Sequence, residues 1–144
     1  MNSLQLRSAT RERNRCSYWD YYVDDRRLAD VLDVGDFIPP IGWLGSVTEL
    51  HFLSMLLRAA DGDLSGNRAP LFVCAECADY GCGVLSCNID RTYEGIVWRD
   101  FGMQTDYDDE LIVDDRYRDR IYTFDPTEYY RTFSGHYDLA KSGG

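Results

Sequence analysis

Positive charge and long apolar runs are both scarce in this sequence. A single lysine, Lys141, accompanies the arginines, and the formal net charge is −10. A general nucleic-acid binder needs a basic face that displaces counterions, and an anionic membrane surface attracts basic segments. We therefore expect neither nucleic acid nor a membrane surface as a partner. No run approaches the roughly 18–20 apolar residues that a membrane helix requires.

The N-terminus lacks a hydrophobic segment of the signal-peptide type. The sequence therefore predicts a cytoplasmic location, in which thiols are kept reduced. The chain has five cysteines, and this odd number leaves at least one that has no partner for a disulfide within the chain.

Motifs of classical catalysis are absent as well. The Gly-rich phosphate loops GxxxxGK[ST] and GxGxxG do not occur, and neither does the GxSxG turn of serine hydrolases. The two histidines, His51 and His136, have no obvious nucleophile beside them in the sequence. The balance of these absences favours a protein that is not an enzyme.

The residues that are present predict one α+β domain over 17–139. Aromatic and β-branched runs indicate strands near 18–23, 71–73, 82–89, 95–101 and 121–124. Helical spacing or capping patterns indicate a helix at 28–32 and further helices that begin at 46 and 125. The expected architecture is an antiparallel sheet of about four to six strands with two or three short helices.

Both ends of the chain are expected to be disordered. Residues 1–16 have no apolar periodicity, and residues 1–15 contain four arginines against one glutamate. This segment is therefore predicted to be a disordered basic tail. The small and polar residues 140–144 are predicted to fray.

The most distinctive motif is a cluster of cysteines, C-A-E-C-A-D-Y-G-C-G-V-L-S-C, at residues 74–87. Thiolates suit zinc, and a C-x-x-C turn lets two sulfurs meet one ion. The pattern therefore predicts zinc as the one candidate cofactor, with Cys74, Cys77 and Cys82 as its ligands. Cys87 is a weaker candidate, because side chains alternate along a strand and Cys82 and Cys87 would point to opposite faces.

Two other interpretations of these cysteines remain open at this point. Free cysteine is among the most buried residue types, so the four thiols fit a hydrophobic core. A C-x-x-C pair also fits redox or nucleophilic chemistry, although such pairs usually open a helix and this one leads into Gly81 and Gly83.

A second candidate site is the acidic segment that precedes the last predicted strand. Its carboxylates and tyrosine are Asp106, Tyr107, Asp108, Asp109, Glu110, Asp114 and Asp115. An EF-hand begins with similarly spaced acids but continues with a glycine that this segment lacks. Opposite charge speeds association, and rigid aromatic side chains are common interface anchors. The segment predicts a docking face for a basic protein, with an ordinary solvated loop as the alternative.

Several motifs together resemble a known family. They are W-D-Y-Y-V-D at 19–24, G-W-L-G at 42–45, L-F-V-C-A-E-C-A-D-Y-G-C-G at 71–83, V-W-R-D-F-G at 97–102 and F-D at 124–125. Over residues 18–133 the chain resembles a family of small uncharacterised bacterial proteins, many of them actinobacterial. The resemblance implies no catalytic residues. It implies that Cys74, Cys77, Cys82, Trp98 and Asp100 belong to one structural unit.

Three functions are compatible with these observations. The leading hypothesis is a non-catalytic acidic domain that docks a basic protein, in the manner of an immunity protein or an antitoxin that masks a toxin. The alternative is a small zinc- or thiol-dependent protein built on Cys74, Cys77 and Cys82. The third is an enzyme whose reaction the sequence does not indicate.

Overall fold

The computed structural model describes residues 1–143. Its elements follow one another in the order β1 (Leu4–Arg11), β2 (Cys16–Val23), β3 (Arg26–Arg27), α1 (Leu28–Leu32), α2 (Ser46–Leu56), β4 (Ala69–Val73), η1 (Tyr80–Cys82), β5 (Val84–Thr92), β6 (Gly95–Gln104), β7 (Tyr122–Phe124) and α3 (Pro126–Gly143). The predicted α+β class is confirmed, and the antiparallel strands are divided between two sheets. Within residues 1–143, no helix is both long and apolar enough to cross a lipid bilayer.

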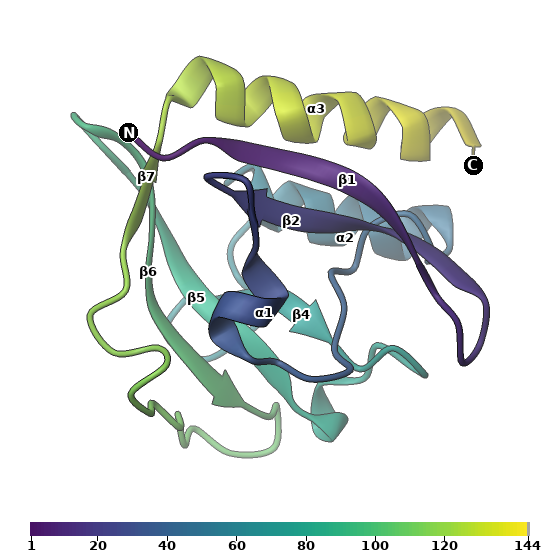
Figure 1. Ribbon diagram of the computed structural model, residues 1–144, viewed down its shortest axis with the longest axis horizontal. Helices are drawn as coiled ribbons and strands as arrows, with labels where there is room; N and C mark the ends of the chain where they lie inside the picture. The colour runs from purple at the N-terminus through teal and green to yellow at the C-terminus, as the bar shows by residue number, and fades with distance from the viewer. Residues whose placement is uncertain (144) are drawn as a thin grey trace.

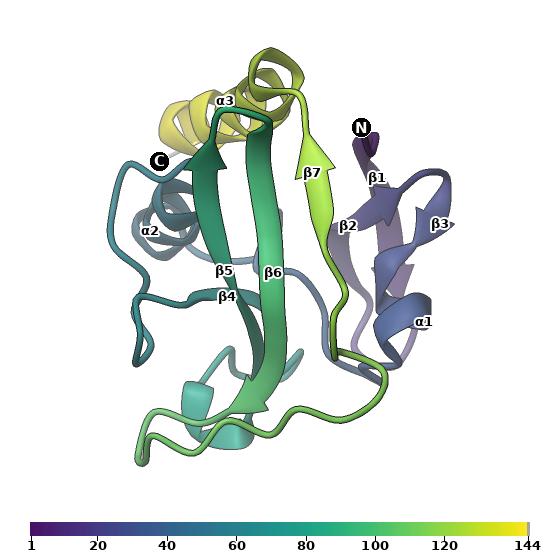
Figure 2. The same cartoon turned by 90° about the vertical axis from the view of Figure 1, so that its left-hand side faces the viewer.

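Strands that are consecutive in the chain are also neighbours in each sheet. The orders are β1-β2-β3 and β4-β5-β6-β7, and every neighbouring pair is antiparallel. Helix α3 contacts α2, β1 and β6, and Figure 1 shows it running alongside β1. In Figure 2 the four-stranded sheet faces the viewer, with the three-stranded sheet beside it and α3 at its upper end.

The largest hydrophobic cluster joins both sheets to α2 and α3. Trp98 of β6 is fully buried in it, and its ring meets that of Tyr21 on β2 edge-to-face, with 5.5 Å between centroids. Trp98 Nε1 donates a hydrogen bond to Tyr129 OH at 3.1 Å, and that hydroxyl donates to the Leu56 carbonyl at 2.6 Å. The Trp98 Nε1–H and the Tyr129 hydroxyl thus both have hydrogen-bond partners, as is usual for buried tryptophan and tyrosine.

The predicted disordered tail at 1–16 is wrong, because residues 4–11 form the strand β1. This strand pairs with β2 along its whole length, and Leu4 and Leu6 pack against the main core. An ion pair of 2.7 Å between Arg7 and Asp25 adds a further tie. The sequence gives only a weak strand pattern here, since the segment is mostly polar and gains its stability from backbone hydrogen bonds to β2.

The last helix begins where its capping pattern predicts. The Asp125 carboxylate accepts a hydrogen bond of 3.0 Å from the backbone amide three residues later, which is an N-cap. The rings of Phe124 and Tyr129 stack with 5.8 Å between centroids, as expected of a hydrophobic staple. The segment expected to fray at 140–144 is helical through residue 143, and residue 144 lies outside the described residues.

Candidate metal centre

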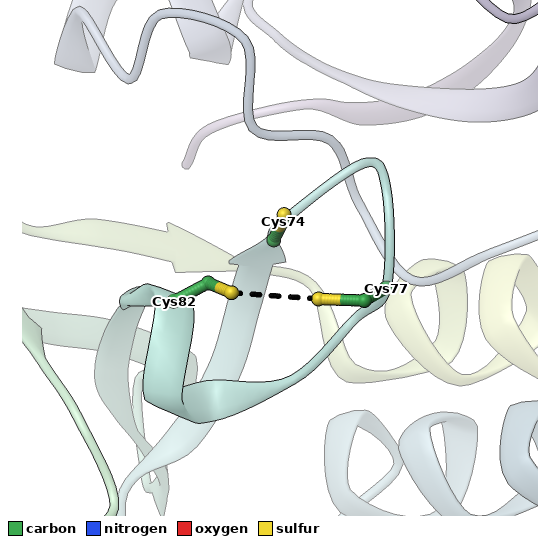
Figure 3. Close-up of side chains that lie close together, drawn as sticks. All are labelled: Cys74, Cys77 and Cys82. Atoms are coloured by element: carbon green, nitrogen blue, oxygen red, sulfur yellow. Dashed lines mark hydrogen bonds between the residues drawn. The ribbon is translucent and has the colours of Figure 1, made fainter.

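The predicted zinc ligands lie in the connection between β4 and β5 (Figure 3). Cys74 directly follows β4, Cys77 lies in the turn, and Cys82 ends the short helix η1. Strands β4 and β5 are adjacent and antiparallel, and Val73 at the end of β4 is paired with Val84 at the start of β5. The connection between the two strands therefore begins and ends at neighbouring positions. The pairing of the sheet therefore brings the two ends of this cysteine segment, residues 74–83, together.

The three sulfur atoms form a compact group. All three Sγ atoms lie within 4.8 Å of one another, and those of Cys77 and Cys82 are 3.5 Å apart. Two thiolates that bind one zinc ion tetrahedrally, each with a bond of about 2.3 Å, are separated by about 3.8 Å. A disulfide needs sulfurs at about 2.05 Å. The observed spacing is closer to that of ligands sharing an ion than to that of a disulfide.

The local backbone fixes the directions of the three side chains. Ala78 adopts a left-handed conformation with φ of 59°, and its N–H donates to the Cys74 carbonyl at 2.9 Å. The Asp79 carboxylate accepts from the Gly81 amide at 2.8 Å and so caps the helix that carries Cys82. A non-glycine residue with positive φ is strained by about 1–3 kcal/mol and persists only where its surroundings hold it.

Contacts from the β1–β2 hairpin help to fix the conformation of the cysteine segment. Arg11 is buried at the end of β1, forms an ion pair with Asp36, and reaches Glu76 of the cysteine segment at 3.2 Å. Asn14 in the hairpin turn donates to the Ala75 carbonyl at 3.4 Å. The contacts with Glu76 and Ala75 join residues more than sixty positions apart, and no local sequence pattern indicates them. They help to hold the cysteine segment in place.

The pKa values of Cys74 and Cys82 are shifted in opposite directions. The pKa of Cys74 is lowered, chiefly because the Glu76 backbone amide donates to its sulfur. The Asp79 amide likewise lies 3.4 Å from Cys77 Sγ. The neighbouring Cys77, first through a hydrogen bond and then through charge repulsion, raises the pKa of Cys82 to about 11. The loss of the Cys82 proton is therefore unfavourable unless a cation takes its place.

The remaining cysteines lie elsewhere. Cys87 is fully buried in the main core at a register shift of β5, and Cys16 begins β2. The interpretation of the cysteines as core residues thus holds for Cys87, whereas Cys77 and Cys82 are exposed. Cys87 does not join the group of the other three sulfurs, and because Cys82 lies in η1 rather than on β5, the predicted alternation between Cys82 and Cys87 along one strand does not apply.

The cluster consists of three cysteines, two of which are exposed. No fourth cysteine, histidine or carboxylate within residues 1–143 joins the group. His51 Nε2 lies 2.8 Å from a carboxylate oxygen of Asp63, and His136 packs edge-on against Trp19. Structural zinc sites usually have four protein ligands, whereas sites with three keep an exchangeable position. Because two of the cysteines are exposed, a fourth ligand has access from solvent.

The acidic segment lies in the connection between β6 and β7, and ion pairs divide it into two parts. Asp114 pairs with Arg116, and Asp115 pairs with Arg118 at 3.0 Å. The other four carboxylates are exposed and form no ion pair with any described residue: Asp106, Asp108, Asp109 and Glu110. None of the four carboxylates of the first part, from Asp106 to Glu110, is therefore neutralised by an ion pair with a described residue.

The two predicted sites are neighbours. A hollow of about 300 Å³ is lined by Gly83 at the end of the cysteine segment and by Tyr107, Asp108 and Glu110 of the acidic segment. Tyr107 is 73% exposed. In Figure 2 both connections lie at the lower end of the four-stranded sheet. The acidic segment and the end of the cysteine segment therefore share one hollow of the surface.

Comparison of the chain with protein-family models, with curated proteins and with solved structures gave no match.

Proposed function

We propose that Cys74, Cys77 and Cys82 bind one zinc ion and that the protein acts as a small zinc–thiolate protein. The observation that carries this proposal is the convergence of three sulfur atoms within 4.8 Å on a segment held by distant parts of the chain. Thiolates are the preferred soft ligands of zinc, and backbone N–H groups near the sulfurs stabilise their negative charge.

The exposed side of the cluster gives the ion a specific role. With three ligands from the protein, the ion retains one position for a water molecule or for a donor atom of a bound partner. The zinc then both pins the connection between β4 and β5 and presents a binding point at the surface. The exposure of Cys77 and Cys82 supports this role.

Metal uptake by variants tests the proposal. Reduced, chelator-treated protein is titrated with Zn²⁺ and examined by native mass spectrometry, and Co²⁺ replaces zinc for absorption spectroscopy. We expect one zinc per chain and the spectrum of tetrahedral, sulfur-bound cobalt. Cys82→Ser should weaken binding more than about 100-fold, because even the loss of outer partners of a ligand costs 10–100-fold. Cys16→Ser is the matched control and should bind like the parent.

Two results would contradict the proposal. The first is a reduced protein that takes up no zinc, and the second is equal binding by the Cys82→Ser and Cys16→Ser variants. A protein without zinc in which mild oxidation joins Cys77 to Cys82, with loss of two thiol hydrogens, would instead favour thiol–disulfide exchange. Mass spectrometry of the tryptic peptides distinguishes these cases.

A second function is favoured by the acidic segment. Four exposed carboxylates without ion pairs surround Tyr107, and this combination supports docking of a basic protein, as in an inhibitor of the immunity or antitoxin type. The two proposals are compatible, because the hollow beside Gly83 adjoins both segments. A basic partner that docks on the acids would approach the open position of the ion.

A further inference from the structure

A second hollow, of about 470 Å³, lies between strands β5 and β6 and the chain that follows β6. Four arginines line it, namely Arg68, Arg99, Arg118 and Arg120, against only two aspartates, Asp100 and Asp119. Among the residues that line the hollow, positive side chains therefore outnumber negative ones, in a protein whose formal net charge is −10. Its volume is in the range of small-molecule sites.

Arg68 is a buried cation with neutral partners. Its side chain is among the buried polar groups, with 6% of the residue exposed. Its Nε donates to Ser86 Oγ and Gln104 Oε1, each at 3.0 Å, and its Nη2 donates to the backbone carbonyls of Ser86 and Asp100. Nη1 donates to Asn88 Oδ1 at 3.3 Å. Every acceptor in this set is uncharged.

The bonding of Arg68 leaves both a charge and a donor for a ligand. A guanidinium group has five N–H donors, two of them on Nη1, and only one acceptor meets Nη1. No carboxylate oxygen of a described residue lies within 4.0 Å of this guanidinium. A buried charge is costly unless it is paired, and burial lowers the pKa of Arg68 for the same reason. An anion from outside would supply the missing charge.

The arginines at the edge of the hollow differ in their partners. Arg99 is paired with Asp90 at 2.7 Å, and Arg118 is paired with Asp115. Arg120 donates only to neutral oxygens among the described residues, the Arg116 carbonyl at 3.1 Å and the Tyr122 hydroxyl at 3.2 Å. Arg68 and Arg120 are therefore the two cations whose charge is available to a ligand.

Apolar side chains complete the wall of the hollow. Phe101, Leu111 and Val113 line it beside the arginines. Leu111 packs directly on β6, because Gly102 has no side chain and a Cβ there would overlap the Leu111 side chain. A bare inorganic ion would leave this apolar surface without a contact, whereas an organic anion would cover it.

We propose that this hollow binds a small organic anion, with its carboxylate or phosphate group on Arg68 and Arg120 and its apolar part against Phe101 and Leu111. Guanidinium groups match both head groups, because their paired N–H donors form two parallel, charge-assisted hydrogen bonds. The site shares no residue with the cysteine cluster, so it stands independently of the zinc proposal.

Titration with four simple probes tests this site. Benzoate and phenyl phosphate carry the two head groups on an aromatic ring, inorganic phosphate lacks the ring, and benzyl alcohol lacks the charge. We expect heteronuclear NMR to show saturable shifts at residues around the hollow with benzoate or phenyl phosphate, and much weaker effects with the other two. The tighter aromatic anion identifies the head group. Binding of neither aromatic anion, or equal binding of benzyl alcohol, would overturn the proposal.

Variants locate the binding. Arg120→Gln should weaken the better probe about tenfold or more, which corresponds to one charge-assisted hydrogen bond. Arg131→Gln on the exposed side of α3 removes the same charge far from the hollow and should have no effect. Equal affinities of these two variants would contradict the site. Arg68 belongs to a buried hydrogen-bond network, and its replacement can unfold the protein. The probe affinity of the Arg68→Gln variant is therefore interpreted only if the amide spectrum of the variant is that of a folded protein.

Discussion

A single carboxylate ties the start of the chain to the turn after β2. Asp24 Oδ1 accepts from the Ser3 amide at 2.8 Å, and Oδ2 accepts from the Asn2 side chain at 2.7 Å. The Ser3 bond is the main cause that lowers the pKa of Asp24. Asp24 itself has a positive φ of 53°, which aspartate tolerates better than most residues. Local charge thus helps to hold the segment before β1.

The first prediction is a pH effect on this contact. Because the folded pKa of Asp24 lies below its unfolded value, its stabilising contribution is present above the unfolded pKa and is lost as the pH falls through the folded pKa. We expect the Ser3 amide chemical shift to titrate with a midpoint below that of an ordinary aspartate, about 3.9. In Asp24→Asn this acid titration should disappear. A midpoint at or above the ordinary value would contradict the assignment.

At the scale of elements, β1 connects several parts of the molecule. It pairs with β2 in eight register positions and contacts α3, and its Arg11 side chain reaches the cysteine segment. The strand therefore supports both the core and the candidate metal centre, although its sequence is mostly polar.

Deletion of residues 1–11 tests this role. We expect a loss of at least about 2 kcal/mol in the free energy of unfolding, because Leu4 and Leu6 lose their packing and β2 becomes an edge strand. Urea denaturation followed by circular dichroism measures the change. Deletion of residues 142–144 is the control and should alter stability by less than about 0.5 kcal/mol. Equal stability of the two truncated proteins would restore the prediction of a disordered tail.

Local patterns predict most elements but few of the contacts between them. The helix at 28–32, the strands around Trp19 and Trp98, and the cap at Asp125 follow from side-chain period and capping chemistry alone. The C-x-x-C spacing likewise indicates the sulfur cluster. The supports from Arg11 and the charge environment of Arg68 depend on pairing between distant strands, and no single stretch of sequence contains that information.

At the scale of the whole molecule, charge is distributed unevenly. Arg116 and Arg118, in the second half of the β6–β7 connection, are paired with Asp114 and Asp115, while the carboxylates from Asp106 to Glu110 have no ion pair among the described residues. A group of four carboxylates without ion pairs thus lies next to the cysteine segment, with which it shares a hollow. A field of this sign attracts cations, whether metal ions or basic proteins, to one end of the protein.

Association kinetics with a basic protein test this distribution. A stable cationic protein such as lysozyme serves as a probe of electrostatic steering. Replacing Asp106, Asp108, Asp109 and Glu110 by their amides should slow association and flatten its dependence on ionic strength, with a smaller effect on dissociation. The same number of amide replacements elsewhere, at Asp30, Asp61, Glu94 and Asp138, is the charge-matched control. Equal effects of the two variants would show that net charge alone, rather than this segment, attracts cations.

The bridge between Asn2 and Phe124 has a consequence for how the protein is made. Asn2 forms a bridge with Phe124 of β7, and its amide donates to the Thr123 carbonyl at 2.7 Å. Asn2 therefore forms this bridge only after residues 123 and 124 have been synthesised, about 6–24 s later at elongation rates of about 5–20 residues per second. Until α3 has been synthesised, β1 lacks the contacts that this helix makes with it. The nascent chain thus presents an incomplete apolar surface, which is the kind of surface that chaperones bind.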